Sequence, residues 1–410
     1  MLLGGHNGNA RESNTVAVNS IIDFDQQIER SNTNSVKFDA LNAVFGSEDV
    51  LPMWVADTDF AAPEAVVQAL IARAQHPVYG YSLFPDSLYH SMIDWFAQRH
   101  NWQIKREWIM LAPGVVPSLH AVAMAFAAEG EGIIVQPPVY PPFFAAAAKT
   151  GRSLVLNPLV RRDGEYRMDL EQLEQCAPQA RVLALCSPHN PVGRVWREGE
   201  LRALLDIARR HNLLILSDDI HCDLTFPGHS HTMLAALATE QDQIITAVAP
   251  SKTFNIAGMG LSALVVPDPA HRQALKTTFE AMHIEPANPF SIAAFEAAYS
   301  QGGPWLDALL DYLQGNVQLV SGYLTEHIPE IRMDQPEGTY LLWLDCSDLG
   351  MSDSELKRFF IREARVGMNP GVSFGEAGSG YMRLNIGTRR AVVQQAMERI
   401  AQAVRELKRT

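Results

Sequence analysis

Three apolar segments between residues 182 and 248 constrain the fold most, because each is followed by polar residues. Residues 182–186, 213–216 and 244–248 have the length and apolar content of buried strands. Asn190 follows the first segment, Asp218 and His221 follow the second, and Lys252 follows the third. In open α/β sheets, ligands bind beyond the carboxyl ends of the strands. We therefore expect these four side chains to meet in one crevice.

The wider pattern predicts an α/β fold. Strand-like segments alternate with helix-like ones between residues 132 and 267, which is typical of a mostly parallel sheet flanked by helices. We expect seven strands or so in this sheet, built into a large domain. After residue 268 the pattern changes to helices at 271–282, 289–300 and 305–327, followed by strands at 340–345 and 381–386 and helices at 352–364 and beyond 388. This part predicts a smaller α+β domain.

The length of 410 residues exceeds what one hydrophobic core usually holds, so two domains are expected. Residues 1–20 are polar and rich in Gly and Asn, which predicts a disordered arm. We place a segment that packs with the small domain at 21–60, the large domain at 61–290 and the small domain at 291–410. Residues 24–45 are expected to be irregular.

Composition excludes several classes of function. The formal net charge of −13 argues against nucleic acid as a partner. No apolar run approaches the roughly 18 residues of a membrane span. The four cysteines have neither disulfide-framework nor zinc-site spacing, so we expect reduced thiols, no metal and a cytoplasmic protein. Cys222, next to His221, is expected to be a packed structural thiol.

Lys252 carries the chemistry that the sequence indicates. A lysine at the mouth of a buried strand is poorly solvated when charged, which lowers its pKa and makes the amine a better nucleophile toward carbonyls. Taken alone it would more often be a surface lysine, but the polar ends of the other two strands favour a site. An asparagine, a carboxylate with a histidine, and a lysine are what pyridoxal phosphate requires. The lysine joins the aldehyde, the carboxylate keeps the pyridine nitrogen protonated, and the asparagine and histidine hydrogen-bond the phenolic oxygen.

The order of the motifs resembles a known family. The chain contains Asn190-Pro191-Val192-Gly193, then Asp218-Asp219-Ile220-His221, then Ser251-Lys252. This order and spacing resemble the fold-type I pyridoxal phosphate enzymes of the aspartate aminotransferase superfamily, and within them the MalY/PatB-type C–S lyases (cystathionine beta-lyases). The resemblance extends from about residue 21 to the C-terminus.

The resemblance implies further cofactor-binding residues. Gly114, Val115 and Val116, at a predicted strand–helix turn, would hold the phosphate at a helix N-terminus together with Ser251. Tyr140 would stack on the pyridine ring. Glycine at such a turn is common, however, and Tyr140 could also be a core residue.

Other residues are implied to bind the substrate or to come from a partner subunit. The resemblance implies that Arg383 holds the substrate carboxylate, that the backbone of Val55 and Ala56 lines the substrate pocket, and that Tyr79 lies nearby. It also implies that Tyr81 reaches the phosphate of a second subunit, which would make the protein a homodimer with shared active sites. The alternatives are a structural salt bridge for Arg383, a core role for Trp54 beside Val55, and a surface turn for the two tyrosines.

One position departs from the pattern of many aminotransferases. They carry an arginine about eight residues after the lysine to hold the phosphate, whereas here Gly258-Met259-Gly260 occupies that region. Either Ser251, Tyr81 and the helix N-terminus suffice, or an arginine from elsewhere substitutes. The departure favours the C–S lyase branch.

The expected activity is therefore β-elimination from L-cystathionine or a related S-substituted cysteine, giving a thiol, pyruvate and ammonia. An aminotransferase acting on an amino acid would use the same residues. A third class, an amino-acid-responsive regulatory binding protein, would carry a separate DNA-binding domain, and the sequence leaves no room for one. Specificity for the thiol side is expected to depend on loops near Trp54, Tyr79 and Asn288.

Overall fold

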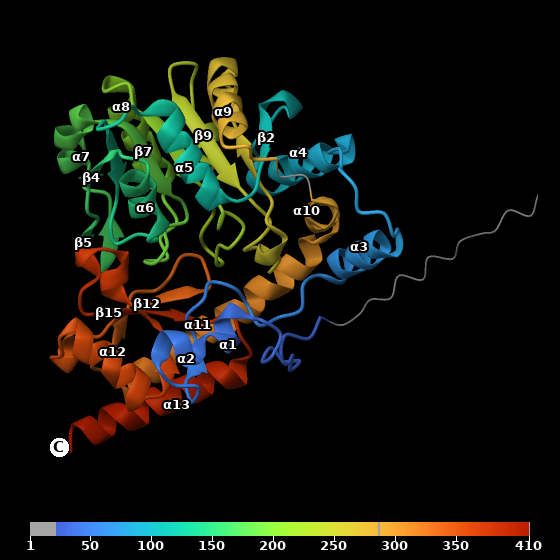
Figure 1. The fold of residues 1–410 in the computed structure, drawn as a ribbon. Helices are drawn as coiled ribbons and strands as arrows, with labels where there is room; N and C mark the ends of the chain where they lie inside the picture. The colour runs from blue at the N-terminus through green and yellow to red at the C-terminus, as the bar shows by residue number, and fades with distance from the viewer. Residues whose placement is uncertain (1–21, 286–287, 410) are drawn as a thin grey trace, which may run out of the picture.

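The computed structural model describes residues 22–285 and 288–409, so the arm predicted at 1–20 lies outside the described residues. Figure 1 shows a large sheet with helices on both sides in one half of the molecule and a smaller group of strands and helices in the other. The long helix α11 (Gly303–His327) runs between the two halves.

The large sheet has seven strands in the order β2-β10-β9-β8-β7-β3-β4. Their bounds are β2 Ile109–Ala112, β3 Gly132–Val135, β4 Ser153–Leu156, β7 Ala180–Cys186, β8 Leu214–Asp218, β9 Gln243–Val248 and β10 Ser262–Val265. Strands β4, β3, β7, β8 and β9 pair in parallel, whereas β10 pairs antiparallel with both β9 and β2. The predicted α/β class, with a mostly parallel seven-stranded sheet, is confirmed.

Helices cover both faces of this sheet because its strands are apolar on both sides. In β8, Leu214 and Leu216 pack into one core together with α5, α6 and α9, whereas Ile215 packs into another with α7 and α8. The helices are α5 Val115–Phe126, α6 Pro142–Lys149, α7 Leu170–Cys176, α8 Glu198–Arg210 and α9 Pro269–Ala281; α3 Glu64–Gln75, α4 Asp86–His100 and α10 Pro289–Gln301 form a further group beside β2. The carboxyl ends of the parallel strands therefore remain open toward the second half of the molecule.

The C-terminal part contains an antiparallel sheet in the order β11-β12-β15-β14. Its strands are β11 Arg332–Met333, β12 Leu341–Asp345, β14 Asn369–Pro370 and β15 Tyr381–Asn385, with helices α12 Asp353–Arg362 and α13 Arg390–Leu407. The short strand β1 (Leu51–Pro52) pairs in parallel with β13 (Val366–Gly367), which attaches the N-terminal segment to this part. The domain boundaries expected at 60 and 290 stay predictions.

Helix α11 packs along α13 through buried side chains such as Leu313, Val317 and Val320. Although α11 has 25 residues, neither it nor any other helix in the described part of the chain is long and apolar enough to cross a membrane.

The prediction of irregular structure at residues 24–45 is wrong in part. Two short helices, α1 (Val36–Asp39) and α2 (Leu41–Phe45), lie there. Leu41 and Phe45 pack with Val50, Trp54 and Ile361 in a small separate core, so tertiary contacts stabilise helices too short to be stable alone. The sequence pattern also did not reveal the hairpin of β5 (Val160–Arg162) and β6 (Glu165–Arg167), nor α6 and α7.

Close backbone packing at Gly371 gives a test of the fold. This buried glycine begins the turn between β14 and β15, and a Cβ there would meet the Gly378 carbonyl oxygen and lie 2.7 Å from the Tyr381 carbonyl oxygen. Because backbone cannot move aside cheaply, we expect Gly371→Ala to lower the free energy of unfolding by about 1–3 kcal/mol. Chemical denaturation measures the change. Gly322 of α11 is the matched control, because a Cβ added there would meet no atom within 4 Å, and Gly322→Ala should leave stability unchanged or raise it by about 0.5–1 kcal/mol. Equal stability of both variants would contradict this packing.

Candidate active site

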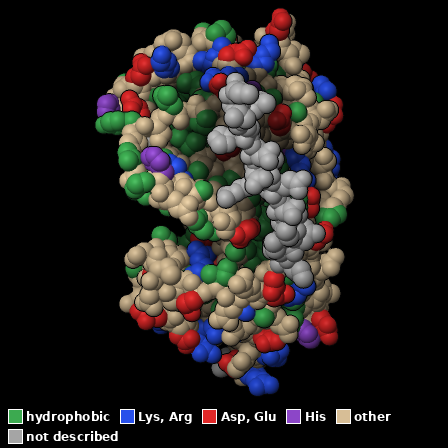
Figure 2. All heavy atoms as spheres, turned by 90° about the vertical axis from the view of Figure 1, so that its right-hand side faces the viewer, with side chains coloured by type: hydrophobic (Ala, Val, Ile, Leu, Met, Phe, Trp, Pro, Cys, Tyr) green, Lys and Arg blue, Asp and Glu red, His purple; other side chains and the backbone are tan. Residues whose placement is uncertain are grey.

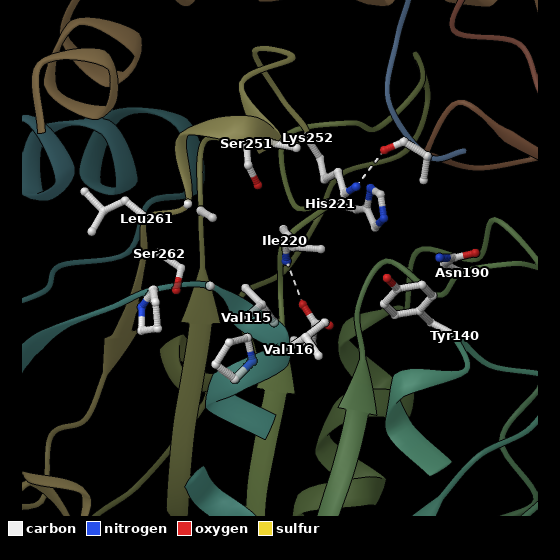
Figure 3. Close-up of a pocket in the computed structure, with 18 of the residues that line it drawn as sticks. Val115, Val116, Tyr140, Asn190, Ile220, His221, Ser251, Lys252, Leu261 and Ser262 are labelled. Atoms are coloured by element: carbon white, nitrogen blue, oxygen red, sulfur yellow. Dashed lines mark hydrogen bonds between the residues drawn. The ribbon is translucent and has the colours of Figure 1, made fainter. Parts of the chain in front are cut away.

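A cavity of about 200 Å³ lies at the carboxyl ends of the parallel strands. Asn190, Asp218, His221 and Lys252 all line it, although they follow three different strands. Figure 3 shows the side chains of Lys252 and His221 on one side of this cavity and Tyr140 and Asn190 on another. The structure thus brings together the four residues that the strand ends predicted.

Lys252 lies in the turn after β9 and is partly buried. Its Nζ donates to the Ala56 carbonyl oxygen at 2.6 Å. Burial lowers the pKa of Lys252 to about 8, and the charge of Arg383 lowers it further, while Asp57 and Asp218 act in the opposite direction. Roughly a tenth of the amine is therefore uncharged at about pH 7, in the form that a nucleophile or base requires.

Asp218 is the last residue of β8 and is buried. Burial raises its pKa to about 7; a hydrogen bond from the Ile220 N–H at 3.2 Å lowers the pKa, the neighbouring charge of Asp219 raises it, and Lys252 lowers it. Such a carboxyl gains much from a cationic partner in the cavity, because the partner would compensate for the lost hydration of the carboxylate. A protonated pyridine nitrogen is such a partner.

His221 is fully enclosed and neutral. Burial lowers its pKa to about 3, and the charges of Lys252 and Arg383 add to this effect. Its Nδ1 has no hydrogen-bond partner among the described residues, and its ring meets Tyr340 edge-on at 6.2 Å. A buried polar atom without a partner is uncommon, so this nitrogen is available to a ligand group in the cavity.

The opposite end of the cavity is suited to an anion. Gly114 is the N-cap of α5, and Val115 and Val116 form its first turn, where backbone N–H groups have no partner within the helix. Ser251 lines the same end, together with Ser262, a residue that the sequence did not single out. Ser262 is buried in β10, which is otherwise apolar. A serine within an apolar run was the sequence signal that could have identified this residue. No arginine is among the described residues that line the cavity, so within the described ranges none replaces the one missing near Gly260.

Arg383 is buried on β15 of the small sheet and reaches the same region. Nη1 donates to Asn190 Oδ1 at 3.1 Å, and Nη2 donates to the Trp54 carbonyl oxygen at 2.9 Å and to Asn369 Oδ1 at 2.8 Å. Within the described ranges no carboxylate forms an ion pair with it, so the salt bridge considered as an alternative is not formed. Burial lowers its pKa to about 10, and its Nε has no partner. A substrate carboxylate would supply the missing counter-charge.

The segment around Ala56 closes the cavity. Ala56 lines it, and its carbonyl oxygen also accepts a hydrogen bond from the Tyr340 hydroxyl at 3.0 Å. Val55 does not line the cavity, but its carbonyl oxygen accepts from Asn385. Trp54 is half-buried against Phe45, with its Nε1 donating to the Lys37 carbonyl oxygen at 3.0 Å.

The structure does not bring Tyr79 and Tyr81 to the cavity of their own chain. Both are exposed in the loop between α3 and α4. The Tyr79 hydroxyl donates to the Ala74 carbonyl oxygen at 2.8 Å, and its ring packs on Phe290. Asn288 is likewise exposed and caps α10 through its side chain.

These residues fit pyridoxal phosphate. The amine of Lys252 and the carboxyl of Asp218 line one cavity, and the buried Nδ1 of His221 lacks a hydrogen-bond partner. The N-terminus of α5 and two serines lie at one end of the cavity. Tyr140, half-buried at the cavity wall, offers a ring face for a planar group. The set therefore provides a partner for the aldehyde, for the ring nitrogen, for the ring itself and for the phosphate.

The raised pKa of Asp218 predicts a pH-dependent stability for the protein without bound ligand. The folded state holds this proton up to about pH 7, whereas the unfolded chain releases it near pH 4. As the pH rises between these values, the free energy of unfolding of the wild type falls, whereas that of Asp218→Asn does not change through this group. At about pH 8 the variant should therefore be more stable than the wild type by on the order of 2–4 kcal/mol, and at about pH 4 the two should differ by almost nothing. Urea titrations at the two pH values measure the difference. Asp94→Asn, at an exposed aspartate of α4, serves as control, and an equally large gain there would contradict the interpretation.

Comparisons with known proteins identify the family of this chain. The sequence model of the aminotransferase class I and II family matches residues 48–400. Cystathionine beta-lyase PatB of Bacillus subtilis is 40% identical over 386 residues, covering 93% of this chain and 100% of PatB. Cystalysin from Treponema denticola, which contains a pyridoxal 5'-phosphate cofactor, is 34% identical with a TM-score of 0.92, covering 94% of this chain and 100% of cystalysin.

A putative aminotransferase from Clostridium difficile, solved with pyridoxal phosphate bound, is 40% identical with a TM-score of 0.92 and covers 93% of this chain and 99% of its own. The family match spans most of the chain, and the relatives are covered over nearly their full length. The chain therefore belongs to the aminotransferase class I and II family and, within it, to the group of MalY/PatB-type proteins that its motifs resemble.

Proposed function

We propose that this protein is a pyridoxal phosphate-dependent C–S β-lyase that cleaves L-cystathionine or a related S-substituted cysteine to a thiol, pyruvate and ammonia. The observation that carries the proposal is the meeting of Lys252 and Asp218 in one cavity with Arg383 beside them, in a chain 40% identical to a cystathionine beta-lyase. The substrate class, a small amino acid with sulfur on its β-carbon, follows from these two facts together.

The residues around the cavity divide the binding of the cofactor among them. Pyridoxal phosphate, when bound, supplies an aldehyde that joins an amino group and a ring that takes up the electrons released at the substrate's α-carbon. Asp218 keeps the ring nitrogen protonated, and His221 and Asn190 offer hydrogen bonds to the ring oxygen. Tyr140 holds the ring face, while Ser251, Ser262 and the N–H groups of Val115 and Val116 bind the phosphate.

Two cationic side chains act on the substrate. Arg383 binds the α-carboxylate, which its hydrogen bonds to Asn190, Asn369 and Trp54 pre-orient it to receive. Lys252 Nζ removes the α-proton, because its pKa near 8 leaves neutral amine at physiological pH. Removal of this proton allows the thiolate to leave from the neighbouring carbon. The aminoacrylate that remains is released and hydrolysed by water to pyruvate and ammonia.

An aminotransferase is the second candidate. The matching family model and the 40% identical C. difficile protein both carry that name. Both reactions begin with the same proton removal, so the scaffold supports either one. The lyase is favoured because the described residues that line the cavity include no arginine, whereas many aminotransferases place one at the phosphate.

We further propose a homodimer with shared active sites. Within one chain Tyr81 and Leu83 are fully exposed, and Val78 and Tyr79 are largely exposed in the same loop. Figure 2 also shows hydrophobic side chains among polar ones on the face of the molecule that carries α3, α4 and α10. Exposed aromatic and aliphatic residues gathered in one loop are typical of an interface. A second subunit would cover these side chains. Tyr81 of each subunit would then lie at the phosphate bound in the other subunit's cavity.

A cytoplasmic location completes the proposal. All four cysteines are free and buried, which suits a reducing compartment. Burial raises the pKa values of all four thiols, so they are protonated and unreactive at neutral pH.

The reaction is tested with L-cystathionine as the only substrate. We expect the purified protein to release pyruvate and a free thiol without added keto acid, and Lys252→Ala to lose visible cofactor absorbance and at least ~10³-fold of the turnover. Pyruvate formation coupled to lactate dehydrogenase and a thiol reagent measure the products. Conversion that requires a keto acid would favour the aminotransferase, and undiminished pyruvate release by Lys252→Ala would contradict the proposed site.

Shared sites are tested by mixing two defective variants. Lys252→Ala lacks the amine, and Tyr81→Ala lacks the residue proposed to act in the other subunit. A random mixture of the two should regain about a quarter of the wild-type sites, because half of the dimers are hybrids and each hybrid has one intact site. Activity after subunit exchange, together with the molecular mass in solution, measures this. No regain over the separate variants, in hybrids shown to form, would mean that Tyr81 does not serve the partner's site.

A further inference from the structure

The turn that carries Asp218 and His221 ends in a further buried aspartate, Asp223, beyond Asp218 and Asp219. Asp223 is buried, and it lines a separate cavity of about 110 Å³ instead of the one shared by Asp218 and His221. Polar side chains of the turn from Asp218 to Asp223 thus line two different cavities. The proposed reaction gives a role to Asp218 and His221 but none to Asp223.

Three donors from two other segments hold Asp223. Its Oδ1 accepts from His100 Nε2 at 2.8 Å and from Trp95 Nε1 at 3.0 Å, both on α4, and its Oδ2 accepts from Thr253 Oγ1 at 2.8 Å. Burial acts to raise the pKa of Asp223, but the bonds from His100, Thr253 and Trp95 outweigh it and hold the pKa below the ordinary value. Asp223 is therefore a buried carboxylate in its charged form.

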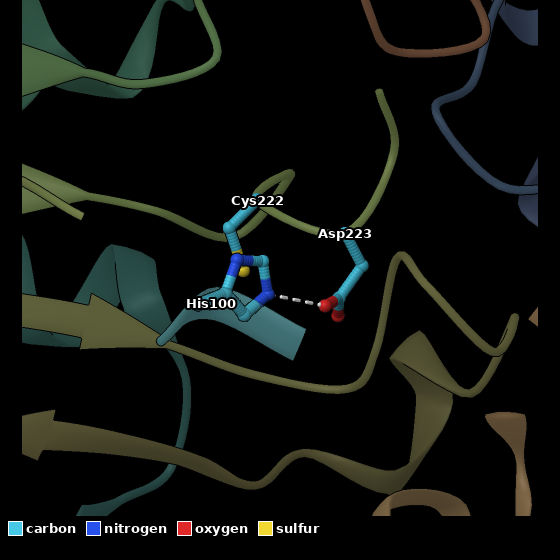
Figure 4. A group of neighbouring side chains, drawn as sticks. All are labelled: His100, Cys222 and Asp223. Atoms are coloured by element: carbon cyan, nitrogen blue, oxygen red, sulfur yellow. Dashed lines mark hydrogen bonds and ion pairs between the residues drawn. The ribbon is translucent and has the colours of Figure 1, made fainter. Parts of the chain in front are cut away.

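The same group could be read as a metal site, since His100, Cys222 and Asp223 lie close together (Figure 4). The hydrogen bonds argue against that reading. The His100 nitrogen that faces Asp223 is a donor to it, and both oxygens of Asp223 already accept from protein groups. Burial raises the pKa of Cys222 well above the ordinary value, so the thiol keeps its proton. The facing atoms of His100 and Asp223 are already paired in hydrogen bonds, so the group offers no set of free atoms to bind a metal ion.

Thr253 is the partner that connects Asp223 to the active site. It follows Lys252 directly and is fully buried. The turn it belongs to is also held by backbone hydrogen bonds from Phe254 N–H to the Pro250 carbonyl oxygen and from Ile256 N–H to the Ser251 carbonyl oxygen. Asn255 binds the backbone of Thr58 and Phe60. Asp223 therefore joins the turn that carries the lysine to the turn that carries the acid.

We propose that Asp223, acting through Thr253, is a positioning residue that sets the place of Lys252 Nζ relative to Asp218 and His221. This inference rests on the proposed function. A charge-assisted hydrogen bond between two buried turns is strong and directional, so it limits how far the lysine backbone can move when the amine exchanges partners. A displacement of about 1 Å at a reacting group can cost roughly a hundredfold in rate.

The test compares Thr253→Val with Thr253→Ser in the full-length enzyme. Valine has the shape of threonine without the hydroxyl, whereas serine keeps the hydroxyl and loses the methyl group. We expect Thr253→Val to lower kcat about tenfold to a hundredfold with a smaller change in KM, to weaken pyridoxal phosphate binding to the apoprotein, and to shift the pH midpoint of the visible absorbance of the bound cofactor. Thr253→Ser should keep the wild-type midpoint and binding constant.

Trp95→Phe is the control within the same network. It removes one donor to Asp223 but leaves the bond to Thr253, so it should lower thermal stability without moving the absorbance midpoint. The inference is overturned if Thr253→Val keeps the wild-type midpoint and binding constant, or if Thr253→Ser or Trp95→Phe moves them as far. A wild-type protein that binds no pyridoxal phosphate would instead refute the proposed function, which keeps the two failures apart.

Discussion

Two basic side chains, the partly buried Lys252 and the buried Arg383, donate to backbone carbonyl groups instead of carboxylates, and the site depends on this arrangement. Lys252 donates to the carbonyl oxygen of Ala56, and Arg383 donates to that of Trp54. A carbonyl dipole orients a cation but does not neutralise it. Burial lowers the pKa values of both residues for the same reason. The uncharged form of Lys252 is then available to an aldehyde, and the unneutralised charge of Arg383 is available to a carboxylate, which are the groups that a pyridoxal phosphate enzyme must bind.

The segment that supplies these carbonyl groups belongs to neither sheet interior, and its position is fixed from several sides. Asn385 of β15 binds the carbonyl oxygens of Val55 and Asp57, and Asn255 of the lysine turn binds Thr58. Behind it, the buried Lys37 and the half-buried Arg30 form ion pairs with Asp57 and Asp59. Both acids are thereby paired with other cations, and among the described residues neither forms an ion pair with Lys252 or Arg383. These contacts hold the segment in place, which is why residues near the N-terminus take part in a site built mainly by strand ends.

The division of the site between two sheets suits a reaction with two separate tasks. Lys252, Asp218 and the α5 N-terminus come from the large sheet and its connections, which hold a cofactor. Arg383 comes from the small sheet, where the proposed function has it bind the substrate carboxylate. Asn190 belongs to the first group and accepts from Arg383, so it joins the two. The proposed link from Asp223 to Thr253 performs a similar task within the first group, because it connects the acid turn to the lysine turn.

The sequence by itself determined the fold class and the meeting of Asn190, Asp218 and Lys252. Neighbouring parallel strands end at the same edge of a sheet, so residues that follow those strands must be close in space whatever the loops do. Only the tertiary structure decided the places of Ser262, Asn369 and Asp223, and the absence of Val55, Tyr79 and Tyr81 from the cavity wall of their own chain. Those positions depend on contacts between segments far apart in the chain, which leave no periodic signal in the sequence, whereas strand ends are encoded locally by where an apolar run stops.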